Sequence, residues 1–132
     1  MSITKDSGRQ SVLVAIQRFT FEDLEDGVAV EAIDLPAGAV RLRGELVIET
    51  AFNSATSDTI AVGDGASATA MLSATNVQAT GKTALTGFEG EIQPTVEALT
   101  LTWDGTGTAP TAGAGYLLVE YGIENRATEV QP

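Results

Sequence analysis

The feature that most limits how this chain can fold is an alternation of apolar and polar side chains with a period of two residues. The clearest example is residues 40–49, VRLRGELVIE, and residues 96–103 alternate in the same way. Residues 116–123 form an apolar segment with one consistent face. Successive side chains of a strand point to opposite faces, so the pattern predicts half-buried strands. The residues predicted to face the core are Val40, Leu42, Leu46, Ile48, Leu99, Leu101, Trp103, Leu117, Val119, Tyr121 and Ile123.

Shorter strands are predicted between tight turns. Residues 11–21 begin apolar on both faces and end alternating, as expected of a strand that leaves a core. Residues 28–35 and 59–62 are two further candidate strands. Gly, Pro and Asp at their ends favour turns, and these lie at Asp26-Gly27, Pro36-Ala37-Gly38 and Gly63-Asp64-Gly65.

Between residues 66 and 93 the pattern weakens, because Ala, Ser and Thr dominate. Glycines at positions 81, 87 and 90 argue against a helix, since each glycine in a helix interior costs about 1 kcal/mol relative to alanine. Irregular structure with one or two short strands is expected here. Gly44, in the middle of a predicted strand, indicates a bulge or a place of close packing.

Six to eight short strands separated by turns predict an all-β fold, and we favour a jelly-roll-like antiparallel β-sandwich over an immunoglobulin-like sandwich. The 132 residues suit one domain. We expect an extended N-terminal arm over residues 1–10, the sandwich over residues 11–123 and a polar C-terminal tail over residues 124–132.

Charge and missing residue types exclude several functions. A net charge of -11 repels phosphate backbones and anionic lipids, so neither nucleic acid nor a membrane is an expected partner. The chain has no cysteine and no histidine, which removes disulfides, thiol nucleophiles, the commonest general base and the usual zinc ligands. We therefore expect no enzyme activity and no cofactor. Without a signal-like or membrane-length apolar run, synthesis in the cytoplasm is expected.

Two aspartates are candidate calcium ligands, although an ordinary turn is the favoured alternative. Asp58 and Asp64 flank one short predicted strand, and carboxylate oxygens suit Ca²⁺. Asp64 next to Gly65 also fits a turn in which the aspartate accepts backbone hydrogen bonds. The acidic run at residues 22–26 is interpreted as a solvated loop, and Trp103 as a core residue rather than an interface anchor.

Basic residues are scarce, which makes them candidate contact residues for a neighbouring acidic copy. Arg41 and Arg43 alternate with predicted core residues, and Lys5 and Arg9 lie in the predicted arm. For Arg41 and Arg43 the alternative is cross-strand pairing within the domain.

Two segments resemble small virion proteins of tailed bacteriophages. They are DGVAVEAIDLPAGAV at residues 26–40 and VIETAFNSATSDTIAVGD at residues 47–64, with LPAGAV, TAFNSATSDTI and VGD as the recognisable parts. The resemblance covers about the first half of the chain.

The resemblance implies a capsid cement or decoration protein on the outer capsid surface of the virion, bound to the major capsid protein and self-associated as a homotrimer. It also implies that the arm reaches across to a neighbour. A tail or head-fibre component and a carbohydrate-binding module remain open. The fibre component, as a binder of host glycans, predicts exposed aromatic side chains on the loops near Phe52, Phe88 or Tyr116, and the carbohydrate-binding module predicts measurable sugar affinity, often with calcium.

Overall fold

Eight strands and one short 3-10 helix make up the part of the chain that the computed structural model describes, which is residue 3 and residues 11–124. Within this part no helix is long and apolar enough to cross a membrane. The predicted arm, apart from residue 3, and the predicted tail after residue 124 lie outside it. In chain order the elements are β1 (Leu13–Thr20), η1 (Phe21–Asp23), β2 (Ala29–Leu35), β3 (Ala39–Thr50), β4 (Ser57–Gly63), β5 (Leu72–Asn76), β6 (Gly81–Ala84), β7 (Glu97–Thr106) and β8 (Ala114–Ile123).

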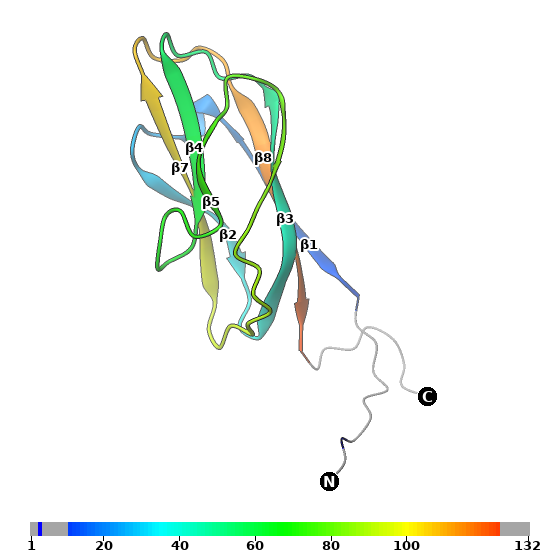
Figure 1. Cartoon of the computed structure of the whole chain (residues 1–132). Coiled ribbons are helices and arrows are strands. Elements are labelled where there is room, and N and C mark those ends of the chain that lie inside the picture. Colours follow the sequence, from blue (N-terminus) through cyan, green and yellow to red (C-terminus); the bar gives the residue numbers. More distant parts are fainter. Residues whose placement is uncertain (1–2, 4–10, 125–132) are drawn as a thin grey trace.

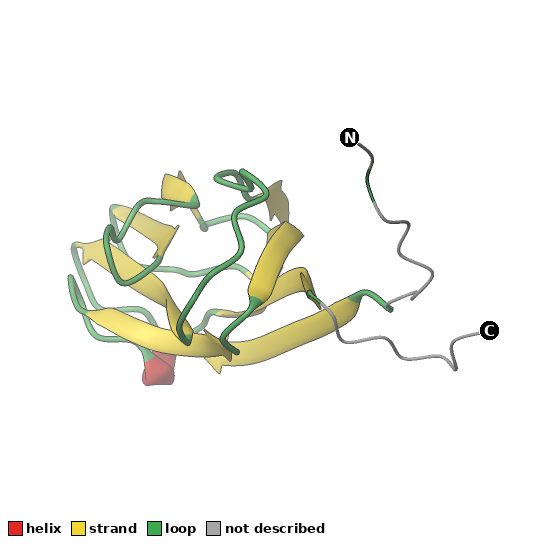
Figure 2. Ribbon diagram, turned by 90° about the horizontal axis from the view of Figure 1, so that it is seen from below, coloured by secondary structure: helices red, strands yellow, loops and turns green. Residues whose placement is uncertain are grey.

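The strands form two four-stranded antiparallel sheets that face each other (Figures 1 and 2). One sheet has the order β1-β8-β3-β6 and the other β2-β7-β4-β5. Each strand of the first half of the chain pairs with its counterpart in the second half: β1 with β8, β2 with β7, β3 with β6 and β4 with β5. A chain folded double in this way and wrapped into two sheets is an eight-stranded jelly roll. The predicted fold class is confirmed.

The core between the sheets is aliphatic and includes one group of three aromatic rings. Phe52, in the connection before β4, lies between Phe19 of β1 and Trp103 of β7, with ring centroids 6.5 and 6.4 Å apart. These three rings therefore link the two sheets. The predicted inward faces of β7 and β8 are confirmed: Leu99, Leu101, Trp103, Leu117 and Val119 are buried, and Tyr121 and Ile123 pack partly buried against them.

The predicted inward face of β3 is correct only in its second half. Leu46 and Ile48 are buried, but Leu42 is 44% exposed and Val40 is only half-buried. The register of β3 against β8 shifts between Arg41 and Arg43, which marks a β-bulge at Leu42. One extra residue reverses the alternation before it, because side chains alternate with a period of two. The prediction for Val40 and Leu42 is therefore wrong, and Ala39 and Arg41 face inward instead.

The weakly patterned region between residues 66 and 93 holds the two short strands β5 and β6, in agreement with the expectation of one or two. Its connections are anchored by backbone hydrogen bonds, among them Met71 N–H to the Val62 carbonyl and Leu85 N–H to the Gly44 carbonyl, both 3.0 Å. Met71, Val77 and Leu85 are buried. The region is therefore part of the core layer despite its weak sequence pattern.

Glycines allow close approach of β3 and β8 at two positions. A Cβ atom at Gly44 would lie 2.6 Å from the carbonyl oxygen of Leu118, closer than real Cβ contacts come, and one at Gly115 would overlap the carbonyl oxygen of Val47. The predicted close packing at Gly44 is confirmed, next to the bulge at Leu42.

The contact at Gly115 generates a stability prediction. We expect Gly115→Ala to lower the free energy of unfolding by about 1–3 kcal/mol, because the added methyl group forces β8 away from β3. Gly122→Ala on the same strand is the matched control: its Cβ would lie 3.9 Å from Val40 Cγ1, so a change within about 0.5 kcal/mol is expected. Urea unfolding of both variants measures this, and equal effects would contradict the packing argument.

Candidate functional site

Asp58, near the start of β4, is a fully buried carboxylate that accepts four hydrogen bonds. Its Oδ1 accepts from Ser54 Oγ at 2.6 Å and from Trp103 Nε1 at 2.9 Å. Its Oδ2 accepts from Ser54 N at 2.8 Å and from Gln78 Nε2 at 2.9 Å. One side chain thus joins the connection before β4, the turn after β5 and the central strand β7.

Two opposing effects set the protonation state of Asp58. Burial by itself raises the pKa, but the hydrogen bonds from Ser54, Gln78 and Trp103 outweigh it and hold the pKa of Asp58 below its ordinary value of 3.8. The carboxylate is therefore ionised at neutral pH. Since each oxygen already accepts two hydrogen bonds, the group is occupied in a structural role.

The two calcium candidates are not brought together. Asp58 lies near one end of β4 and Asp64 just past the other. Asp64 Oδ1 accepts from the backbone N–H of Ala66 at 2.9 Å and of Ser67 at 3.0 Å, which is the turn named as the alternative. Within the described part of the chain no group of three or more Asp, Glu, His or Cys is placed to hold a metal ion.

Arg41 points inward at one end of the sandwich and forms ion pairs across the two sheets. Its Nε lies 3.5 Å from Glu97 Oε1 and its Nη1 lies 3.8 Å from Asp64 Oδ2. The Arg41 side chain is 13% exposed, and both of these ion pairs lie within the domain. The inward direction follows from the bulge at Leu42. The interface role of Arg41 stays a prediction, beside the pairing within the domain that was its alternative.

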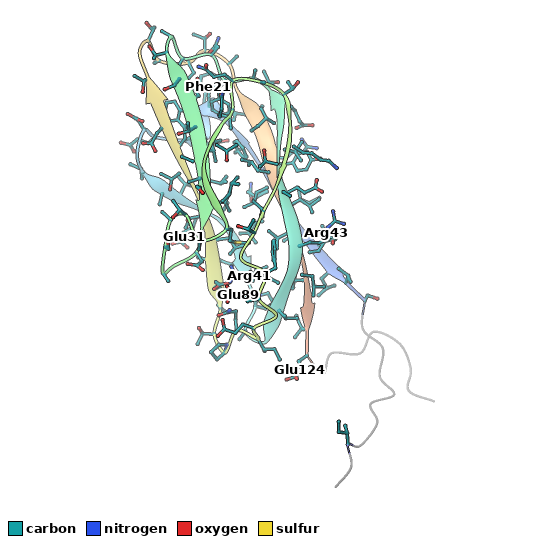
Figure 3. All side chains as sticks on the ribbon, viewed as in Figure 1. Phe21, Glu31, Arg41, Arg43, Glu89 and Glu124 are labelled. Atoms are coloured by element: carbon teal, nitrogen blue, oxygen red, sulfur yellow. The ribbon has the colours of Figure 1, made fainter. Side chains whose placement is uncertain are left out.

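Glu97 beside Arg41 has an altered pKa. Burial raises the pKa of Glu97, Arg41 opposes the rise, and the negative charges of Asp64 and Glu91 add to it, so the pKa lies above its ordinary value of 4.5. The same cluster borders a cavity of about 230 Å³, whose lining includes Arg41, Asp64, Glu89 and Glu91. Figure 3 shows Arg41 and Glu89 in this region, at the end of the sandwich. Its acidic wall disfavours anionic ligands.

The outer face of the sheet β1-β8-β3-β6 has a row of exposed ion pairs. Arg43 lies 3.0 Å from Glu45 and 3.4 Å from Glu120, its cross-strand neighbour, and projects from β3 (Figure 3). Arg18 lies 2.6 Å from Glu49 and stacks over the ring of Tyr116. Arg43 thus makes the predicted cross-strand pair while remaining exposed, and its interface role stays a prediction.

The other two interface candidates, Lys5 and Arg9, lie outside the described residues.

The strand β1 exposes aliphatic side chains that its apolar sequence pattern predicts to be buried. It is an edge strand (Figure 1), and the side chains of Val12, Val14 and Ile16 on and just before it are 54%, 51% and 55% exposed. A groove of about 390 Å³ lies along the side of the strand that faces β2, with Phe19, Leu24 and other residues in its lining. Sequence analysis identified no site here, although residues 11–21 carried the signal of apolar residues on both faces.

The aromatic side chains that a glycan-binding fibre component would expose are largely covered. Phe52 is buried, Phe88 packs partly buried against the core, and Tyr116 is half-buried beneath Arg18. Sugar-binding grooves rely on exposed ring faces, so these three residues offer little to a glycan.

Solved structures share this fold, although no protein-family model and no curated protein sequence matches the chain. A chain in the capsid asymmetric unit of cyanophage Pam1 is 22% identical with a TM-score of 0.72, covering 93% of this chain and 91% of that one. A chain in the acid-stable capsid of Helicobacter pylori bacteriophage KHP30 is 15% identical with a TM-score of 0.67, covering 87% and 90%. A chain in the capsid of Ralstonia phage GP4 is 18% identical with a TM-score of 0.63, covering 96% and 92%.

The hydrogen bonds of Asp58 generate a prediction with a defined pH dependence. We expect Asp58→Asn to lower the free energy of unfolding at neutral pH by about 3 kcal/mol, because the amide nitrogen would face an N–H or O–H donor. The folded-state pKa of Asp58 is lowered, so its stabilising contribution is present above pH 3.8 and is lost as the pH falls through the folded-state value.

The deficit of the Asp58→Asn variant should therefore shrink below about pH 4 in urea unfolding curves. Asp34→Asn, at an exposed position of β2, controls for the loss of one negative charge. A deficit that is independent of pH would contradict the ionised state of Asp58.

Glu97 generates a prediction of opposite sign. Its pKa is raised on folding, so its favourable contribution is present below pH 4.5 and is lost as the pH rises through the folded-state value. Because glutamine mimics the protonated carboxyl, we expect Glu97→Gln to gain stability relative to the unmodified chain between about pH 4 and pH 7. Thermal unfolding across this range measures it, with Glu31→Gln on β2 as the control for net charge. A stability difference that falls with rising pH would refute it.

Proposed function

We propose that this chain is a non-enzymatic structural component of a tailed-phage capsid, a cement or decoration protein that binds the outer surface of the shell and stabilises it. The observation that carries the proposal is the likeness of the whole chain to chains in three phage capsid structures. The likeness covers 87–96% of this chain and 90–92% of theirs. The chains are therefore of similar length and share one domain.

The proposal of a contact role is supported by the overall charge of the sandwich and not by its buried polar groups. The buried carboxylate of Asp58 already accepts four hydrogen bonds, and the cavity next to Arg41 has carboxylates on its wall. What the molecule does offer is a rigid sandwich with a net charge of -11. A protein of this charge is soluble at high concentration and complements a basic partner surface, which in this proposal belongs to the major capsid protein.

Self-association as a homotrimer is the second part of the proposal. Two open sheets leave edge strands at β1, β6, β2 and β5, and neighbouring copies can cover such edges. Arg43, Arg41 and the arm residues Lys5 and Arg9 are the proposed basic contacts to acidic neighbours.

The test is to mix the purified protein with expanded, undecorated capsids of the phage that encodes it and to image them by cryo-electron microscopy. We expect regular density at capsomer junctions. Bare shells, with the protein found instead on the tails or fibres of native virions, would overturn the cement proposal and favour the fibre alternative.

The proposed arm contact is tested in the same assay. A variant lacking residues 2–10 should reach lower occupancy on the shells, because the arm is proposed to reach a neighbour. Removal of residues 125–132 is the control for shortening the chain at an end. Full occupancy of the variant without residues 2–10 would show that the arm is not essential.

A further inference from the structure

The burial of β1 does not match its sequence. Residues 12–16, VLVAI, are apolar on both faces, which is the pattern of a strand covered on both sides. In the structure Phe19 is the buried residue of β1; Leu13 and Ala15 are half-exposed, and Val14 and Ile16 are each more than half exposed. The strand therefore lacks cover on its outer face and along its free edge.

The other three edge strands have features that block pairing with another chain. β5 and β6 are only five and four residues long, and β5 also has a register shift against β4. β2 has a register shift between Glu31 and Ile33 and exposes the charges of Glu31 and Asp34. β1 runs for eight residues in unbroken register against β8 and exposes aliphatic side chains. Natural proteins protect edges with short strands, charges and bulges. β1 has the weakest protection of the four, since its one charged side chain, Arg18, lies near the end of a long and regular strand.

The charge distribution identifies the kind of partner. Residues 7–21 contain Arg9 and Arg18 and no acidic residue, so all 18 acidic residues of the chain lie outside this segment. The carboxylates closest to β1 across the sheet are paired, Glu120 with Arg43 at 3.4 Å and Glu49 with Arg18 at 2.6 Å. Two copies with a charge of -11 each repel one another over most of their surface, and this repulsion is weakest at the edge strands without acidic residues, β1, β5 and β6. Of these three, β1 is the longest and the one that exposes a row of aliphatic side chains.

We propose that β1 is the self-association surface of the protein, where the aliphatic side chains of Val12, Val14 and Ile16 pack against a second copy of this chain. The groove between β1 and β2 lies beside this surface, with Phe19 and Leu24 and the carboxylates of Asp23 and Glu31 in its lining. This inference rests on the self-association proposed above and assigns its location.

The test compares the mass in solution of the full chain and two variants by light scattering after size-exclusion chromatography, over a range of concentrations. Val14→Lys places a charge in the proposed contact, at a position that is 51% exposed and pairs with Glu120 across the sheet, so the change is compatible with the fold of one copy. Val96→Lys makes the same change at a position that is 63% exposed and outside β1. We expect the unmodified chain and Val96→Lys at three times 13.6 kDa, and Val14→Lys at 13.6 kDa.

Circular dichroism and thermal unfolding check that each variant is folded. If Val14→Lys fails to fold, Val14→Thr replaces it, since threonine keeps the shape and strand preference of valine. A buried hydroxyl without a partner should then raise the dissociation constant at least about tenfold.

Three outcomes overturn the inference. An unchanged oligomer in folded Val14→Lys places the contact elsewhere. An unchanged oligomer combined with reduced occupancy on capsids assigns β1 to the capsid protein. A monomeric unmodified chain removes self-association altogether, while the capsid-binding proposal is still decided by its own occupancy measurement.

Discussion

The carboxylate of Asp58 is the interaction on which much of the sandwich depends. It fixes the indole of Trp103, which contacts Phe52, which in turn contacts Phe19 on the opposite sheet. This series runs from β4 and β7 through the core to β1. A buried charge costs free energy unless it is paired or fully hydrogen-bonded, and the four donors around Asp58 meet that condition. Changing one donor therefore weakens the contact between sheets as well as the connection before β4.

Close approach of backbones is the second constraint on the same core. Cβ atoms at Gly105 and Gly113 would overlap or crowd the rings of Trp103 and Phe52, so these glycines make room for the aromatic group. On the first sheet Gly44 and Gly115 allow β3 and β8 to lie together. Glycines thus occur where a larger side chain would prevent the close contacts of the core.

Much of the fold could be predicted from the sequence, because the alternation on β7 and β8 is local and regular. The inward placement of Leu99, Leu101 and Leu117 followed from it. The inward placement predicted for Val40 and Leu42 is wrong, because the bulge at Leu42 shifts the alternation by one residue. Gly44 was the one nearby residue that indicated a bulge, and it did not locate the shift. The inward turn of Arg41 came from the same bulge. The site at Asp58 could not be predicted, because two of its partners, Gln78 and Trp103, lie 20 and 45 residues away and meet it only in the folded chain.

The fold leaves the choice of partner to surface chemistry, since one architecture serves many functions. A jelly roll buries one face of each sheet and leaves edges that must be protected or paired. Here protection is uneven: acidic residues and a bulge limit contacts at β2, and short length limits them at β5 and β6, whereas β1 is a longer strand that exposes aliphatic residues. In the proposed assembly the acidic surface favours a basic partner and opposes contact between copies, and the aliphatic edge of β1 is the proposed place where copies meet. If both proposals hold, the charged surface and the aliphatic edge strand serve two different contacts, one with the shell and one with a neighbouring copy.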